Sequence, residues 1–161
     1  MMDENYHNLL VLDNCLIDCF TSLYGITTLQ CRHCKKIVFH MPTVYKILHL
    51  QKYYLSKYNL KFTITSFYRC DEYNKSIGGA ISSMHLVGRA VDIAQTFDNI
   101  DEFISLASDI GFTTILYYPS RKFFHIDTRQ RGIFVNKNHK IKTDFKNTNS
   151  KNGQNPGLFT V

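Results

Sequence analysis

The sequence TSFYRCDEYNKSIGGAISSMHLVGRAVD, residues 65–92, predicts both the fold and the chemistry of this chain. It holds His85 seven positions before Asp92, and apart from Arg89 the residues between them are apolar or small. Downstream, the segment FFHIDTR supplies a second histidine, His125, and a second aspartate, Asp127. Two histidines and one carboxylate are a sufficient set of protein ligands for a catalytic zinc, which keeps its fourth position for water. The pattern therefore favours a zinc centre.

Length and composition predict one globular domain. The chain has 161 residues, 44% of them hydrophobic, and a net charge of +6, which makes anionic polymers plausible partners. Its N-terminus is acidic, and no apolar run reaches the roughly 18 residues that a membrane span needs, so neither a secretory signal nor membrane insertion is expected. Five cysteines, an odd number without a signal, argue for reduced thiols rather than a disulfide scaffold.

Hydrophobic periodicity predicts alternating helices and strands. Helices are expected at 4–23, ended by Gly25, at about 43–58 after Pro42, and at 99–110, capped by Asp98 and ended by Gly111. Strands are expected at 61–67, 89–94, 112–118 and 122–128, and residues 68–88 are expected to form a long irregular loop.

Strand alternation places the candidate ligands on common faces. In RAVDIA, Asp92 shares its face with the small side chains of Ala90 and Ala94, which leaves room beside the carboxylate for an ion. In KFFHIDT, His125 and Asp127 share the face opposite Phe124.

The remaining cysteines admit two interpretations. Cys31 and Cys34 form a Cys-x-x-Cys motif, which is half of a structural zinc site. Cys70 is the best third thiol, and His33, His40 or another cysteine could be the fourth ligand; the alternative is reduced cysteines in a turn. Cys15 and Cys19 lie four apart on the first predicted helix and are expected to be small buried hydrophobic residues.

The combination of TSFYRC, Asn74, GGAISSMHLVGRAVDI and FFHIDTR resembles the zinc D-alanyl-D-alanine carboxypeptidase family of peptidoglycan peptidases, over about residues 31–131. It is most similar to the short branch that includes phage and bacterial cell-wall endopeptidases. The resemblance implies an α+β fold shared with the hedgehog signalling domain and vancomycin-resistance dipeptidases: an antiparallel sheet of about four strands, with helices packed on one side.

The resemblance also implies roles for particular residues. By motif, the zinc ligands would be His85, Asp92 and His125. Arg69 would lie in the cleft and hold a substrate carboxylate or stabilise the developing charge, and Ser83 would bind substrate or support the loop that carries His85. Many members carry an acidic general base three positions before the last histidine, where this chain has Lys122.

The short branch instead tends to have an aspartate two positions after that histidine. We therefore predict Asp127 as the general base. A role in orienting a ligand histidine is the alternative.

These expectations define one zinc peptidase-like domain at 1–135, with an N-terminal helical segment at 1–30, a family core at 31–131 and a polar basic C-terminal extension at 136–161. The expected activity is zinc-dependent hydrolysis of amide bonds in peptidoglycan stem peptides or cross-links, of carboxypeptidase or endopeptidase type.

Two other function classes compete with it. One is a zinc-bearing binding module of the same fold without turnover. The other is a zinc-finger-like nucleic-acid binder built on Cys31 and Cys34, which the few basic residues around them disfavour. We expect a monomer that binds no nucleic acid. It would be cytoplasmic as synthesised and act on the wall if released, for example by a phage lysis system.

Overall fold

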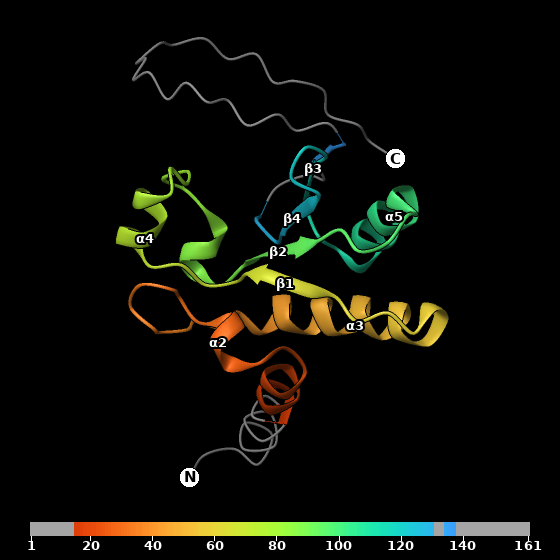
Figure 1. The fold of residues 1–161 in the computed structure, drawn as a ribbon, viewed down its shortest axis with the longest axis horizontal. Helices are drawn as coiled ribbons and strands as arrows, with labels where there is room; N and C mark the ends of the chain where they lie inside the picture. Colours follow the sequence, from red (N-terminus) through yellow and green to blue (C-terminus); the bar gives the residue numbers. More distant parts are fainter. Residues whose placement is uncertain (1–14, 131–133, 138–161) are drawn as a thin grey trace.

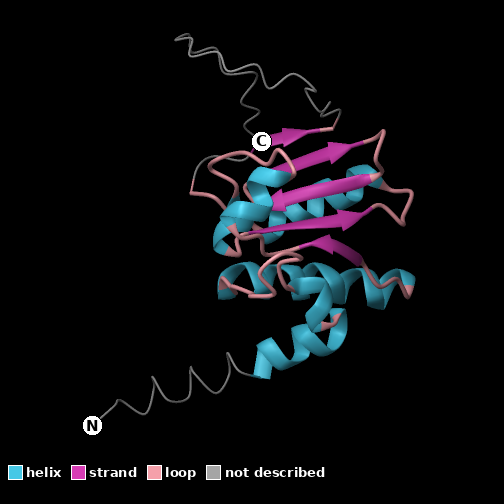
Figure 2. Cartoon of the chain, turned by 60° about the vertical axis from the view of Figure 1, so that its left-hand side comes forward, coloured by secondary structure: helices cyan, strands magenta, loops and turns pink. Residues whose placement is uncertain are grey.

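The computed structural model of this protein describes residues 15–130 and 134–137 (Figure 1). Within these residues, five strands form a single sheet, seen as one layer in Figure 2. The strands are β1 (Thr63–Ser66), β2 (Ala90–Ala94), β3 (Thr114–Tyr118), β4 (Phe123–Asp127) and β5 (Phe134–Asn136). Their order in the sheet is β1-β2-β4-β3-β5, and all neighbours are antiparallel except β3 and β5, which are parallel.

Helices surround this sheet. Residues 15–24 are helical, and the chain continues with α2 (Ile26–Leu29), α3 (Met41–Tyr58), α4 (Asp71–Ser76), the single-turn 3-10 helix η1 (Met84–Val87) and α5 (Ile100–Ile110). The predicted α+β class with a mainly antiparallel sheet is confirmed. In the described part of the chain no helix is both long and apolar enough to cross a membrane.

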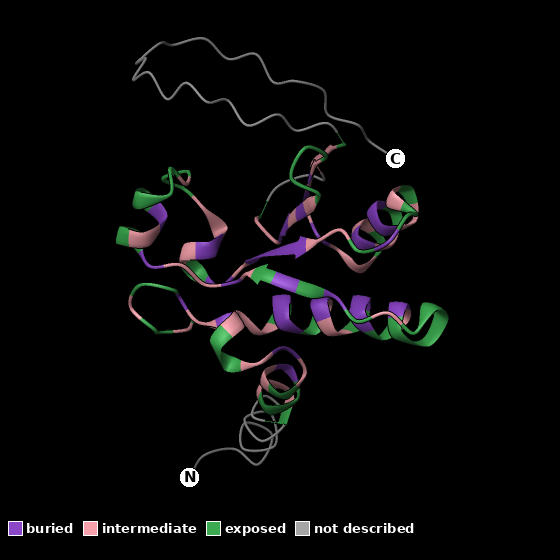
Figure 3. Ribbon diagram, in the orientation of Figure 1, coloured by how far each residue is buried: buried purple, intermediate pink, exposed green. Residues whose placement is uncertain are grey.

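The hydrophobic core lies on one face of the sheet, under α3 and α5. Val91 and Ile93 of β2 and Phe124 of β4 are fully buried there, together with Ile47 of α3 and Phe103 of α5. Figure 3 shows β2 buried up to its last residue, which is half-buried, whereas α3 alternates between buried and exposed positions. Burying one such side chain stabilises the folded state by about 1.5–3 kcal/mol. The apolar side of each strand is therefore committed to the core, and the opposite side is left to carry the polar residues of the site.

The segment predicted as an irregular loop contains two short helices. Residues 71–76 form α4 because Asp71 and Glu72 lie in its first turn and Lys75 in its last, which suits the helix dipole. Gly88 ends η1 with φ of +66°, and a Cβ there would lie 2.1 Å from the carbonyl oxygen of Val38. Only glycine fits this close approach, which leads the chain from His85 directly into β2.

Other local predictions were wrong at single positions. The side chain that caps α5 is Asn99, which accepts from the backbone N–H of Glu102, rather than Asp98. Cys15 and Cys19 are exposed, because the neighbouring Phe20 carries the buried face of that helix. The strand β5 was not predicted, since its three residues carry too little pattern. Residues 4–14 of the first predicted helix and 138–161 of the predicted extension lie outside the described residues.

Candidate metal centre

The face of the sheet opposite the core carries the candidate ligands. Asp92 of β2 and His125 of β4 are directly paired in the antiparallel register, so their side chains share this face. His85 reaches the same place from η1, immediately before β2. Strand pairing and one short helix thus bring together three side chains that are up to 40 residues apart in sequence.

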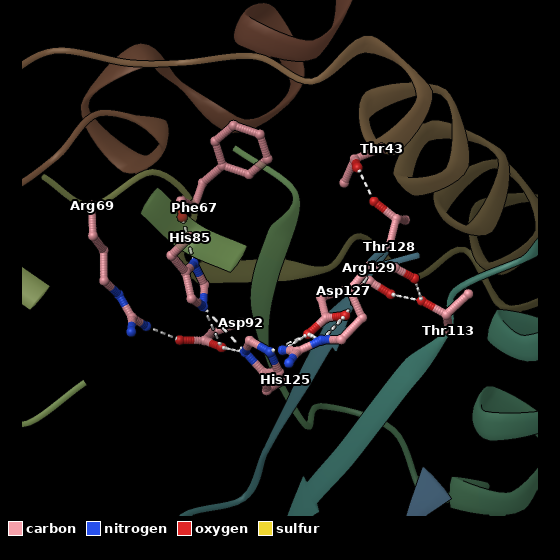
Figure 4. A network of polar contacts seen from close by, with 10 residues as sticks. All are labelled: Thr43, Phe67, Arg69, His85, Asp92, Thr113, His125, Asp127, Thr128 and Arg129. Atoms are coloured by element: carbon pink, nitrogen blue, oxygen red, sulfur yellow. Dashed lines mark hydrogen bonds and ion pairs between the residues drawn. The ribbon is translucent and has the colours of Figure 1, made fainter. Parts of the chain in front are cut away.

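The three ligand atoms form a compact triangle (Figure 4). His85 Nε2 lies 3.1 Å from Asp92 Oδ1, His125 Nδ1 lies 2.9 Å from the same oxygen, and the two nitrogens are 3.2 Å apart. In a tetrahedral zinc site with bonds of about 2.0–2.1 Å, neighbouring ligand atoms lie about 3.3 Å apart. The triangle therefore has nearly the dimensions that a zinc ion would impose.

The position of the hydrogen on the His85 ring also indicates a cation at this site. Its Nδ1 lies against the backbone carbonyl oxygen of Phe67, so Nδ1 must carry the hydrogen and donate it. In the neutral ring, Nε2 then directs a lone pair at the carboxylate oxygen of Asp92, which is also an acceptor. Burial of His85, which is 1% exposed, lowers the pKa of its imidazole, although the nearby Asp92 raises it. A cation between the two acceptors resolves this conflict.

His125 is oriented by a carboxylate on its far side. Its Nε2 lies 3.2 Å from Asp127 Oδ2, which leaves Nδ1 directed at Asp92. Without a metal, burial lowers the pKa of His125, but hydrogen bonds with Asp127 and Asp92 outweigh it and raise the pKa to about 9. A bound metal would replace the proton on Nδ1.

The side chain of Asp127 is fully buried and paired with Arg129. Arg129 Nε donates to both carboxylate oxygens at 2.9 Å, and its backbone N–H donates to Oδ1 at 3.2 Å. Burial raises the pKa of Asp127, but hydrogen bonds from His125 and Arg129 hold it well below its usual range. The carbonyl oxygen of Arg129 is in turn held by the Thr113 hydroxyl at 2.7 Å. This carboxylate faces His125 as a charged acceptor with few free lone pairs.

Arg69 lies on the other side of Asp92. Its guanidinium forms an ion pair with Asp92 Oδ2, and its Nε donates to the Ser66 hydroxyl at 2.8 Å. Burial raises the pKa of Asp92, but the two imidazoles beside its Oδ1, those of His85 and His125, outweigh burial and keep the pKa far below its usual range. Arg69 thus occupies one carboxylate oxygen and leaves the other toward the two histidines.

The other predicted residues lie at the edges of the site. Ser83 is the half-buried residue directly before η1, two positions before His85. Lys122 is not in β4 but in the preceding turn, exposed and with φ of +48°. It therefore belongs to the turn between β3 and β4, not to the strand face that carries His125.

Three participants were missed from the sequence. Arg129 follows His125 and Asp127 at strand-like spacing in FFHIDTR, so alternation could have suggested it. Ser66 was placed on a strand but given no role, and its pairing with Asp92 depends on a register irregularity in β1. The backbone oxygen of Phe67 carries no signal in the sequence.

A family model with the description Peptidase M15 matches residues 23–127, a span that includes the three candidate ligands, Arg69 and Asp127. No curated protein matches this chain.

Proposed function

The chain belongs to the peptidase M15 family, whose members are zinc-dependent, and we propose that it hydrolyses amide bonds of peptidoglycan stem peptides or cross-links. The observation that carries this proposal is the triangle of His85 Nε2, Asp92 Oδ1 and His125 Nδ1, with edges of 2.9–3.2 Å. We assign these three side chains as the zinc ligands.

The donor set suits a hydrolytic zinc. Two imidazoles and one carboxylate hold the metal with three protein ligands and leave a position for water. A zinc bound in this way polarises a carbonyl and lowers the pKa of its water to about 7.

The residues around the ligands prepare the site. We assign Asp127 and Arg129 to holding the His125 ring so that Nδ1 faces the metal, a role in which the carboxylate accepts from Nε2–H. Arg69 fixes Asp92 through one oxygen. Its guanidinium is also the group best suited to pair with a carboxylate of the peptide, and Ser83 is the candidate for a further hydrogen bond to substrate.

The assignment of cell-wall peptidoglycan as the substrate is supported by the resemblance of the motifs and by the charge of the chain. The net charge of +6 favours approach to an anionic polymer such as the cell wall. The bond that is cleaved, whether terminal in a stem peptide or in a cross-link, is an outcome of the experiment below.

One observation favours the alternative, a zinc-bearing module without turnover. Lys122 stands where many relatives of the resembled family have an acidic base, and the Asp127 carboxylate is buried and paired with Arg129. Neither candidate position thus offers a carboxylate that is free of a charged partner, which favours a module without turnover.

The experiment is incubation of the purified chain with purified peptidoglycan, with and without a chelator, followed by mass spectrometry of the released peptides. We expect new peptide ends that disappear with chelator and return when zinc is added. His85→Ala should abolish release and lose the zinc of this centre, about one ion per chain, whereas the control His49→Ala, at an exposed position of α3, should retain both the release and that zinc. A chain that binds zinc in the His85 site, binds peptidoglycan and releases no peptide would support the alternative instead.

A further inference from the structure

A second cluster of metal-ligating side chains lies outside the candidate zinc triangle. Cys31 and Cys34 stand in the turn after α2, and Cys70 is the residue that precedes α4. The three sulfur atoms all lie within 4.8 Å of one another, although Cys31 and Cys70 are 39 residues apart in sequence. Cys31 and Cys70 are buried and Cys34 is half-buried, so the fold has concentrated three thiols in one protected place.

The spacing of the sulfurs suits a shared cation. Cys31 Sγ and Cys70 Sγ are 3.6 Å apart. In a tetrahedral zinc site with Zn–S bonds of about 2.3 Å, two sulfurs lie about 3.8 Å apart. A disulfide would require a separation of about 2.05 Å.

A nitrogen ligand is available beside one of the thiols, that of Cys70. His33 lies inside the same turn, and its Nδ1 is 3.5 Å from Cys70 Sγ. The Glu72 carboxylate is also near, within 4.8 Å of His33 and Cys70. Structural zinc sites are closed by four sulfur and nitrogen ligands, so His33 is the better fourth ligand and Glu72 a charged neighbour.

The backbone of the turn is arranged around the first cysteine. The N–H of Cys31 donates to the carbonyl of Lys36 at 2.8 Å, and the N–H of Lys35 donates back to Cys31 at 3.0 Å. Lys35 adopts φ of +60°, which lets the turn close tightly.

Backbone N–H groups also point at the Cys31 sulfur. The N–H of Cys70 lies 3.3 Å from it. Burial raises the pKa of this thiol, but the N–H groups of Cys70, Cys34 and His33 outweigh burial and lower it to about 7. The neighbouring Cys70 shifts the other way: the backbone N–H of Tyr73 lowers its pKa, but burial and the hydrogen bond with Cys31 outweigh it and raise the pKa to about 11. The metal-free pair therefore favours one thiolate, the form that binds metals, on Cys31.

We propose that Cys31, Cys34, Cys70 and His33 form a second, structural zinc site, distinct from the centre at His85 and independent of the proposed activity. On binding, each coordinating thiol releases its proton to solvent and the histidine binds as the neutral ring.

The site would tie the turn after α2 to the segment that supports the other centre. Cys70 directly follows Arg69, and the carbonyl oxygen of Phe67 in the same segment accepts from His85. A metal at Cys70 therefore anchors the residues that orient two members of the candidate metal centre.

The test is cobalt titration of the metal-free, fully reduced chain, followed by absorption spectroscopy. Thiolate ligands give Co²⁺ an intense near-ultraviolet charge-transfer band, which the His85 centre, with nitrogen and oxygen ligands only, cannot produce. We expect the band in the wild-type chain and in His85→Ala. We also expect two zinc ions per wild-type chain by elemental analysis.

Variants then assign the ligands. Cys34→Ser, at the half-buried position, should weaken cobalt binding by more than about a hundredfold, beyond the loss caused by removing an outer partner of a ligand. His33→Ala should weaken it while the charge-transfer band persists. Glu72→Gln should leave the affinity within about tenfold of wild type. The exposed thiols provide the controls, since Cys15→Ser and Cys19→Ser should bind like the wild type.

Two results would overturn the proposal. One is a reduced, folded wild-type chain, checked by circular dichroism and thiol titration, that shows no charge-transfer band. The other is a band that survives both Cys34→Ser and Cys70→Ser, because the cobalt would then be bound by thiols elsewhere. In the first case, a Cys31–Cys70 disulfide in chain purified without reductant would assign the two thiols to a redox pair instead.

Discussion

Replacing Asp127 with asparagine separates the two roles that its carboxylate could have. A general base must reach a water on the metal and accept its proton. The Asp127 side chain is instead fully buried, lies 3.2 Å from His125 Nε2 and is paired with Arg129. Asparagine keeps an oxygen that can accept from Nε2–H but removes the negative charge, so the variant perturbs the electrostatic support of His125 with little change in shape.

We expect Asp127→Asn to weaken metal binding. Loss of an outer partner of a ligand histidine typically weakens metal affinity by about ten- to a hundredfold, which corresponds to roughly 1.4–2.7 kcal/mol. Asp127→Asn should therefore bind zinc that much more weakly, and its turnover should return to within about tenfold of the wild type once zinc is saturating. Competition with a chromophoric chelator gives the affinity, and peptide release from peptidoglycan at several zinc concentrations gives the turnover.

The control removes a carboxylate elsewhere. Asp101 is exposed and pairs with Lys137 at the surface, so Asp101→Asn should change neither quantity. If Asp127→Asn binds zinc normally and loses about two to four orders of magnitude in turnover at full occupancy, Asp127 is the base and the orienting role is refuted. If zinc affinity and turnover both match the wild type, neither role holds.

Two further predictions concern the candidate metal centre, and a third concerns the hydrophobic core. Arg69→Lys should lower turnover sharply because lysine cannot form a two-pronged contact with a substrate carboxylate, and a parallel loss of zinc affinity would show that its main task is to hold Asp92. In the metal-free chain, the raised pKa of His125, about 9, adds stability that is fully present below pH 6.5 and lost as pH rises through 9, up to about 3 kcal/mol. The melting temperature of metal-free chain should fall over that range while that of zinc-loaded chain does not; a flat metal-free profile would contradict this. Phe124→Ala should cost about 3–5 kcal/mol in chemical denaturation, whereas Ile81→Ala, at a 95% exposed position, should stay within about 0.5 kcal/mol.

The sequence determined the parts of this protein that depend on local periodicity. Alternation in RAVDIA and KFFHIDT places Asp92 and His125 on the face opposite Val91 and Phe124, and the structure has that arrangement. Helix periodicity likewise located α3 and α5, and Gly111 ended α5 as predicted. These patterns are readable because one face of each element must be apolar to enter the core.

Hydrophobic periodicity could not predict elements that are only a few residues long. The short helices α4 and η1 and the three-residue strand β5 have no apolar repeat long enough to detect. Cys15 and Cys19 share a helix face, as their spacing requires, but periodicity could not tell whether thiols or Phe20 would meet the core.

Only the tertiary structure determined which residues contact one another in the candidate metal centre and in the cysteine cluster. The sequence showed that Asp127 shares a strand face with His125, but the ion pair with Arg129 and the complete burial of the carboxylate depend on packing of the whole sheet. Contacts such as Phe67 to His85, or Cys31 to Cys70 across 39 residues, arise from chain crossings that no local repeat encodes. Residue types and periodicity therefore specified which groups could bind a metal, whereas long-range packing set which ring nitrogen faces it and which charges hold it there.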